Sequence, residues 1–340
     1  MSWVKKGSLF LIILFVLLFV LSQAFLPENI YGLKHVSKRN RAVIGISQEP
    51  ENSIQLLIVG DSESYTSVST MQLWKETGIP TYICGQPGQR ISETYYIIKK
   101  ALETQNPRVI MIETNLMYRY NNKMKETESS IKEMIKYYFP VFMYHDMWKA
   151  AIKGKEMARP DYKGFQIRTH VKPYNGGEYM HETTKTKKVP EYVSEYFDKI
   201  IELCNENGVE ILLYSAPSPK NYNYMKHNGI AAFAKQKNIS YVDLNLHLDE
   251  LHIDWSTDSC DSGDHLNVSG AHRVNEYMNE YLVSNYNFAD MRADKRYSKW
   301  NEMQGKYEKR VKTVIEKIRG IGNCLYRNTG IYYTYDRDSG

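Results

Sequence analysis

Two short stretches, far apart in the chain, hold the residue types that nucleophilic chemistry needs. The first is Gly60-Asp61-Ser62, which follows the apolar run 56–59. Such a run predicts a buried strand that ends sharply and presents a serine at the carboxyl edge of a sheet, where α/β folds bind ligands. A serine hydroxyl is a weak nucleophile without a base and without donors for the developing oxyanion. Gly-Asp-Ser by itself is also a common strand-ending turn, so the partners must be found elsewhere.

The second stretch supplies a base. His265 differs from the other eight of the nine histidines because it lies in a loop crowded with carboxylates. Either Asp261 or Asp264 could orient its imidazole ring, as a carboxylate does in a Ser-His-Asp triad. We favour Asp261, since neighbouring side chains in an extended loop point opposite ways, and Asp264 could instead cap the next helix. Calcium binding is a weaker interpretation because the spacing fits no EF-hand, and we predict no metal site.

Donors for an oxyanion are predicted at three further positions. They are the backbone N–H of Ser62, a backbone N–H at Gly85 or Gly88, and the side-chain amide of Asn115. The two glycines lie in a loop after a short apolar stretch, and Asn115 follows another. One such donor is worth roughly 3–4 kcal/mol in a transition state.

To bring these candidate residues to one edge of a sheet, the chain must alternate strands with helices. We expect strands at residues 55–59, 81–84, 109–112, 210–214 and 241–244. Helical spacing of apolar residues predicts helices near 92–103, from Pro190 to the stop at Asn207-Gly208, near 228–237 and near 269–282. Strands that alternate with helices favour a mostly parallel, doubly wound α/β sheet.

The segment 121–189 interrupts this alternation. It has helical pieces near 131–138 and 141–152 and no clear strand. We interpret it as a helical insertion, which either caps the carboxyl edge of the sheet or decorates its periphery. The α/β domain then spans residues 53–290, and residues 291–340 form a basic helical extension and tail.

The N-terminus predicts export. Residues 7–27 carry no charge and 9–21 are solidly apolar, which is long enough for a membrane span. We favour an uncleaved signal anchor over residues 1–27, although Ser22-Gln23-Ala24 resembles a signal-peptide cleavage site. Both interpretations place the rest of the chain outside the cell membrane. Residues 28–52 lack apolar periodicity and are expected to be a polar tether.

Composition excludes several classes of protein. The formal net charge of +5 is too small to indicate nucleic-acid binding. Much of that charge lies between Arg292 and Arg319, where ten Lys/Arg face four Asp/Glu, and a solvated helix face explains it better than contact with an anionic membrane. The four cysteines form no CxxC pair, which excludes a zinc ribbon or a thioredoxin-type site.

In chain order, these blocks resemble the SGNH (GDSL-type) hydrolase superfamily over about residues 53–285. The stretch from Asp261 to Ala271 is particularly similar to the final block of membrane-anchored, extracellular members. The anchor followed by an exported domain resembles the D-alanine transfer proteins of teichoic acid synthesis and polysaccharide O-acetylation proteins. Those proteins work beside membrane-bound O-acyltransferases.

The resemblance implies a flavodoxin-like sheet, with Ser62 as nucleophile, His265 as base, and Gly85 or Gly88 with Asn115 as oxyanion donors. The family's Asp-x-x-His spacing would place its acid at Ser262. The sequence therefore leaves two questions open. Either Asp261 or Asp264 orients His265, and the site is either a Ser-His-Asp triad or a Ser-His dyad.

We therefore expect an exported, membrane-anchored serine esterase or O-acyltransferase, without a cofactor, that acts on a cell-envelope glycan or teichoic-type polymer. A membrane-bound O-acyltransferase is the expected partner. The alternative is a non-catalytic protein of the same fold that binds an acylated polymer or such an acyltransferase. The sequence does not distinguish transfer to water from transfer to a sugar hydroxyl.

Overall fold

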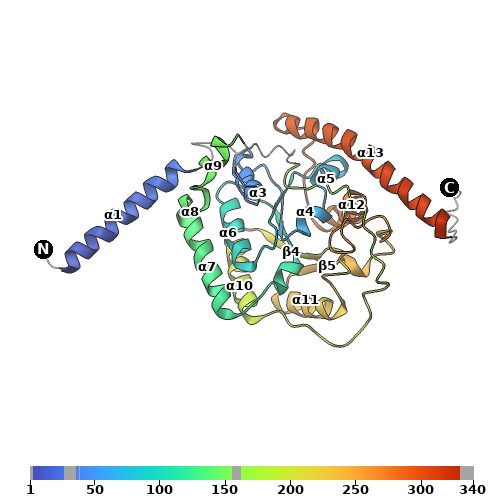
Figure 1. The fold of residues 1–340 in the computed structure, drawn as a ribbon, viewed down its shortest axis with the longest axis horizontal. Helices are drawn as coiled ribbons and strands as arrows, with labels where there is room; N and C mark the ends of the chain where they lie inside the picture. The colour runs from blue at the N-terminus through green and yellow to red at the C-terminus, as the bar shows by residue number, and fades with distance from the viewer. Residues whose placement is uncertain (1–2, 27–35, 38, 155–161, 330–340) are drawn as a thin grey trace. The chain divides into compact units, whose positions relative to one another are not determined.

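The computed structural model describes residues 3–26, 36–37, 39–154 and 162–329 and contains one parallel sheet flanked by helices (Figure 1). Its strands run in the order β2-β1-β3-β4-β5. They are β1 (Leu56–Gly60), β2 (Thr81–Gly85), β3 (Val109–Glu113), β4 (Glu210–Ser215) and β5 (Ser240–Asp243). This is the flavodoxin-like order, so the predicted fold class is confirmed.

The central strands are buried along their whole length. Every residue of β1, β2 and β3 is buried, as expected for apolar strands covered on both faces of a parallel sheet. β1 pairs in parallel with both neighbours, with Leu56 opposite Thr81 of β2 and opposite Val109 of β3. The carboxyl ends of these three strands therefore lie at one edge, and the strand order reverses between β1 and β3. Ligands bind at such a switch point in open α/β sheets.

Two compact units make up the chain. The first comprises Met1–Ser62, Thr81–Gly164 and Val189–Leu213, and the second comprises Glu63–Pro80, Phe165–Lys188 and Tyr214–Gly340. Helices of the first unit are α1 (Trp3–Ala24), α3 (Arg41–Gly45), η2 (Ile46–Gln48), α6 (Ile91–Ala101), η3 (Thr114–Tyr118), α7 (Lys123–Tyr138), α8 (Val141–Tyr144), α9 (Met147–Ile152) and α10 (Glu191–Glu206). Helices of the second unit are α4 (Ser64–Ser67), α5 (Thr70–Thr77), α11 (Tyr224–Lys237), η4 (Leu244–Leu246), α12 (Val268–Asn285), η5 (Lys295–Tyr297) and α13 (Ser298–Thr329).

In the first unit, α6 packs against both α7 and α10 (Figure 1). One face of α10 is buried, with Val193, Phe197, Ile200 and Cys204 on it. Their helical spacing is what gives α10 one apolar side. Of the strands, α6 contacts β1.

The helix α1 is long and apolar enough to cross a membrane, with a mean hydropathy of 2.5 in its most apolar window. Length and composition fit a signal sequence equally well. Its side chains are exposed apart from its last turn, where Ser22 is buried and the Ser22 hydroxyl accepts a hydrogen bond from the backbone N–H of Val141 at 3.4 Å. The ring of Phe15 also meets the ring of Phe139 edge-on. The last turns of α1 are therefore packed against the start of α8.

The stretch 28–52 is more ordered than the expected polar tether. Residues 27–35 and 38 lie outside the described part, but Arg41–Gly45 form α3 and bury Val43 and Ile44. Ile46 follows and is also buried. A helix of five residues is too short to produce a visible apolar period, which is why the sequence did not indicate it.

The insertion 121–189 is only partly helical. Its helical pieces are α7, α8 and α9, and α7 packs against α6. The second part, which belongs to the second unit, runs beside the histidine loop: the N–H of Lys172 donates to Ser259 O, and the N–H of Ser262 donates to Lys172 O. This segment is extended and held by backbone hydrogen bonds, so its apolar side chains follow no regular spacing. The sequence therefore did not predict its position.

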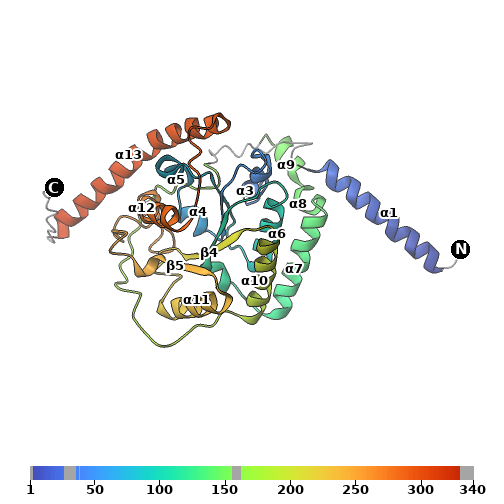
Figure 2. The ribbon, with the colours of Figure 1, turned by 180° about the vertical axis from the view of Figure 1, so that it is seen from behind.

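In the second unit, α12 packs against α4 and α5, and α13 lies along α5 (Figure 2). The predicted basic extension is thus largely one long helix, and residues 330–340 of the tail lie outside the described part. Its apolar side chains Tyr307, Val311, Ile315 and Ile318 are buried, while the cations lie between them. The Tyr307 hydroxyl accepts a hydrogen bond from the Ser69 hydroxyl at 2.7 Å, which ties α13 to the start of α5.

Candidate active site

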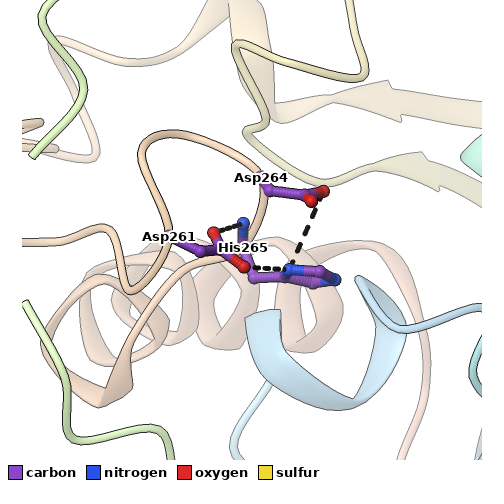
Figure 3. Close-up of side chains that lie close together, drawn as sticks. All are labelled: Asp261, Asp264 and His265. Atoms are coloured by element: carbon purple, nitrogen blue, oxygen red, sulfur yellow. Dashed lines mark hydrogen bonds and ion pairs between the residues drawn. The ribbon is translucent and has the colours of Figure 1, made fainter. Parts of the chain in front are cut away.

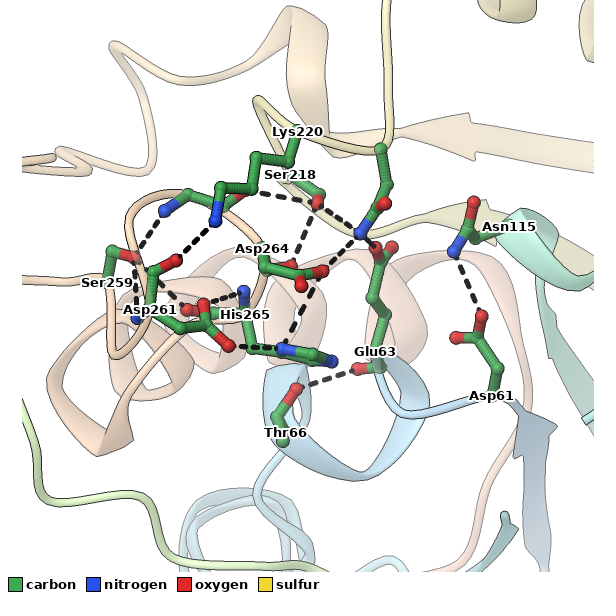
Figure 4. A network of polar contacts seen from close by, with 12 residues as sticks. Asp61, Glu63, Thr66, Asn115, Ser218, Lys220, Ser259, Asp261, Asp264 and His265 are labelled. Atoms are coloured by element: carbon green, nitrogen blue, oxygen red, sulfur yellow. Dashed lines mark hydrogen bonds and ion pairs between the residues drawn. The ribbon is translucent and has the colours of Figure 1, made fainter. Parts of the chain in front are cut away.

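The switch point between β1 and β3 holds a buried polar cluster. Asp61 is fully buried, and its Oδ2 accepts a hydrogen bond from Asn115 Nδ2 at 2.9 Å (Figure 4). Arg119 Nε donates to the same oxygen at 2.5 Å. The N–H of Asn115 donates to the Glu113 carboxylate at 2.9 Å. Since a buried carboxylate is tolerated only when paired, Asp61 both requires Arg119 and fixes the Asn115 amide. An amide nitrogen carries two hydrogens, so Asn115 can donate to Asp61 and to a second acceptor.

The glycine loop after β2 forms a tight turn. Gln89 N–H donates to Gln86 O at 3.1 Å, and Gly88 has φ +63°, a value that favours glycine. The N–H of Ile83 donates to Lys163 O, on the side of β2 away from β1. Because alternate N–H groups of a strand point to opposite edges, the N–H of Gly85 points to that same side. The geometry therefore favours Gly88 over Gly85 as a donor near the end of β1.

Ser62 lies at the end of the first unit, in a turn between β1 and α4, and is half-buried. One peptide bond separates it from Glu63, which begins the second unit and whose side chain is buried. Its chain neighbours Asp61 and Glu63 are buried, which holds the backbone of this turn in place. The position, directly after β1, is the one that the sequence predicted for the serine.

The His265 loop of the second unit brings together the predicted base and both predicted acids (Figure 3). Asp261 meets His265 twice: Oδ1 accepts from the backbone N–H at 2.7 Å, and Oδ2 lies 2.6 Å from Nδ1. An ionised carboxylate only accepts, so Nδ1 carries the proton and Nε2 is the basic nitrogen. Asp264 lies farther away, with its Oδ1 3.7 Å from Nδ1. The carboxylate that holds the ring is therefore Asp261.

A sharp turn explains this departure from the Asp-x-x-His spacing. Ser262 and Gly263 have φ values of +66° and +88°, so the chain reverses between Asp261 and His265. A Cβ at position 263 would lie 2.9 Å from a carbon of the Tyr174 ring, in addition to the backbone strain. The turn lets an acid four residues before the histidine reach the ring.

The loop after β4 fixes Asp264 (Figure 4). Asn221 Nδ2 donates to Asp264 Oδ1 at 2.6 Å and to Glu63 Oε1 at 2.7 Å. The Ser218 hydroxyl donates to the backbone carbonyl of Asp264 at 2.9 Å, and Lys220 Nζ donates to that of Asp261 at 2.8 Å. Asn221 thus connects the residue after Ser62 with the residue before His265.

The sequence missed these residues of the β4 loop. The available signal was position: Ser218-Pro219-Lys220-Asn221 follows a predicted strand and must lie at the carboxyl edge of the sheet. Glu63 and Arg119 were missed as well, because nothing in their local pattern distinguishes them from ordinary surface charges.

The cap of α12 is Asn267 and not Asp264. Asn267 Oδ1 accepts from the N–H groups of Ser269 and Gly270, and its Nδ2 donates to Thr257 O at 2.6 Å and His170 O at 3.2 Å. Asp264 is three residues too early in the chain to serve the first turn. The fully buried Asn267 therefore anchors the loop, while Asp264 faces the histidine.

Two competing nucleophiles are excluded by their surroundings. Burial, and secondarily Asp261, raises the pKa of the Cys260 thiol to about 12, so it is protonated at neutral pH. Ser215 is fully buried, and its hydroxyl bonds to the hydroxyls of Tyr222 and Tyr241. Neither group provides an activated nucleophile.

The side chains of Asp261, Asp264 and His265 place possible metal-ligand atoms within 4.8 Å of one another. The hydrogen bonds described above already explain this proximity. A cation would have to displace Nδ1 of His265 from Asp261 and Asn221 from Asp264.

The structure thus groups the predicted site residues in two sets. Asn115, Gly85, Gly88 and Ser62 belong to the first unit, and Asp261, Asp264 and His265 to the second. Within each set, the predicted neighbours lie at the carboxyl ends of strands or in the loop that follows β5.

Neither a protein-family model nor a curated protein sequence matches this chain. Solved structures do resemble it. A GDSL-like lipase from Bacteroides thetaiotaomicron is 10% identical with a TM-score of 0.39, over 73% of this chain and 98% of that one. A family 3 carbohydrate esterase from Clostridium thermocellum is 15% identical with a TM-score of 0.36, over 68% and 96%. At such low identities and TM-scores, the chemistry rests on the geometry of the site itself.

Proposed function

We propose that this chain is a serine esterase or O-acyltransferase in which Ser62 is the nucleophile, His265 the general base and Asp261 the orienting acid. The observation that carries the proposal is the double contact of Asp261 with His265. It fixes the ring, sets the proton on Nδ1 and leaves Nε2 to take the proton of a hydroxyl. Two observations support the proposed pairing of His265 with Ser62. Ser62 directly precedes Glu63 in the chain, and Asn221 Nδ2 donates both to Glu63 and to Asp264, the residue before His265.

In the proposed reaction, Ser62 Oγ attacks an ester carbonyl while Nε2 accepts its proton. Asn115 Nδ2 and the N–H groups of Gly88 and Ser62 are the proposed donors to the oxyanion. The leaving alcohol takes the proton from His265, and an acyl-serine ester remains. A water molecule or a sugar hydroxyl then attacks this ester, with His265 again as base, and Ser62 is regenerated.

We further propose that the enzyme is anchored in the cell membrane by α1 and acts outside it on a cell-envelope glycan or teichoic-type polymer. A membrane-bound O-acyltransferase is the proposed partner. The apolar exposed surface of α1 supports the anchor.

The direct test is labelling with a serine-reactive fluorophosphonate. Wild type and Ser284→Ala should label, while Ser62→Ala should not; Ser284 is the matched control because it is an exposed serine near the end of α12, outside the proposed site. Folded wild-type protein that does not label would refute the proposal and favour a non-catalytic binding protein. Products formed from an acylated glycan, with and without a sugar acceptor, would then separate hydrolysis from transfer.

A further inference from the structure

A cavity of about 470 Å³ lies in the first unit, bordered by α3, α6, α7 and α8. Its lining includes none of the residues proposed for catalysis. The volume is in the range of pockets that hold small organic ligands. Some of its lining residues are apolar and others are polar, and their chemistry indicates the kind of ligand that fits.

One side of the cavity is apolar. Ile44 of α3 packs with Val36, Tyr144 and Met147, and Met143 covers this cluster from α8. Ile44, Met143 and Tyr144 all line the cavity. A ligand bound there would place a hydrocarbon portion against these side chains, because polar groups would lose hydrogen bonds to water.

Other lining residues are polar and adjoin the glycine loop. Arg39 Nη2 donates to both carboxylate oxygens of Glu93, at 2.5 and 2.7 Å, and Arg39 also donates to Pro87 O. Gln86 Nε2 donates to Asn40 Oδ1 at 3.3 Å. Burial raises the pKa of Glu93 although Arg39 opposes it. The cavity therefore extends from an apolar wall to the turn that carries Gly88.

The apolar side adjoins the proposed membrane anchor. Leu26, two residues beyond α1, lines the cavity, and α8 receives the last turn of α1 through the Ser22–Val141 hydrogen bond. Phe139 touches Phe15 of α1 and, on its other side, Phe142 of α8, which is 46% exposed and also lines the cavity. If α1 crosses a bilayer, the apolar side of the cavity thus lies beside the bilayer surface.

We propose that this cavity binds an ester-linked acyl lipid from the membrane. The beginning of its hydrocarbon chain packs against Ile44 and Met143, and its polar head group is directed toward Arg39, Glu93 and the glycine loop. In such a lipid the ester joins the chain to the head group, so binding in this orientation brings an ester to the polar side. The inference rests on the proposed function and deepens it, because it names a membrane lipid as a substrate class of the same enzyme.

The test uses the full-length chain in nanodiscs of phosphatidylethanolamine and phosphatidylglycerol, doped with phosphatidylglycerol that carries a diazirine in an acyl chain near its ester. Irradiation followed by peptide mapping should show lipid adducts on α3 and α8 residues of the cavity. Met143→Trp fills the cavity from a half-buried position and should lower these adducts at least tenfold. Met134→Trp is the matched control, because Met134 lies on an exposed face of α7 outside the cavity lining, and should leave them unchanged.

Adducts confined to α1 and to the outer face of α7, or equal adduct formation in Met143→Trp, would overturn the proposal. A free diazirine fatty acid, added without a bilayer, should label the cavity at least tenfold less. Equal labelling would show that a soluble acyl compound, and not a membrane lipid, is the ligand. Fluorophosphonate labelling of Ser62 in the same samples keeps the two proposals apart, since a chain that binds lipid without labelling would refute the esterase proposal, and with it the lipid's role as substrate, but not the lipid-binding site.

Discussion

The two acidic side chains beside His265 should have very different effects on catalysis. Both are 38% exposed, so solvent screening does not distinguish them, and the difference is one of geometry. Asp261 makes two hydrogen bonds of 2.6 and 2.7 Å to His265, whereas the closest oxygen of Asp264 is 3.7 Å from the ring nitrogen. Asn221 holds that Asp264 oxygen at 2.6 Å.

The magnitudes follow from these contacts. A hydrogen bond to a charged group is worth about 1.5–3 kcal/mol, so Asp261→Ala should lower kcat/KM by about 10–150-fold. Asp261→Asn should cost more, up to about 10⁴-fold, because an amide N–H facing Nδ1 favours the wrong tautomer. An exposed ion pair without a hydrogen bond contributes about 0.2–1 kcal/mol, so Asp264→Asn should cost about fivefold or less.

The assay is hydrolysis of p-nitrophenyl acetate by the detergent-solubilised full-length chain, with circular dichroism to confirm that each variant is folded. A larger loss in Asp264→Asn than in Asp261→Asn would refute the assignment of the orienting acid. Equal wild-type rates in both variants would show that no carboxylate orients His265 and that the site is a dyad.

Three further outcomes are expected. Cys260, with a pKa of about 12, should have a thiolate fraction of about 10⁻⁴ at pH 8 and resist iodoacetamide until urea unfolds the chain; rapid labelling of native protein would contradict its burial. Asn267→Ala should lower the free energy of unfolding by about 2–4 kcal/mol in urea titrations, because a cap and buried bonds are lost, whereas Asn285→Ala at the exposed end of α12 should cost less than about 0.5 kcal/mol. Gly263→Ala should cost about 1–3 kcal/mol through its φ of +88° and its approach to Tyr174, and should reduce esterase activity; an active variant of unchanged stability would disprove the need for this turn.

The sequence predicted the sheet well because its strands are continuous apolar runs. All five lie within one residue of the expected start, and their order agrees with the expected fold. Short or polar elements were not predicted: α5 begins with Thr70 and carries few apolar side chains, and α3 has five residues. The basic helical extension was predicted, and α13 is that helix; the many charges between Tyr307, Val311, Ile315 and Ile318 obscured only its apolar side.

Site residues were predictable where chemistry and chain order act together. His265 and Asp261 stand out because an imidazole and a carboxylate occur in one loop after a strand. Asn221 and Arg119 act through contacts with residues distant in sequence, so no local pattern marks them. The choice of Asp261 depended on two positive φ angles, at Ser262 and Gly263, which the sequence suggests only through its single glycine.

If α1 spans a membrane as proposed, its packing against α8 would also limit where the enzyme can work. A domain on a loose stalk samples a wide range of heights above a bilayer, whereas the buried Ser22 and the Phe15–Phe139 contact would hold this one close to the surface. Polymer chains whose acceptor groups lie well above the lipid head groups would then be out of reach of the site. Acceptors attached to a lipid would be modified first. Thickness of the envelope layer, as well as chemical structure, would decide which polymers are modified.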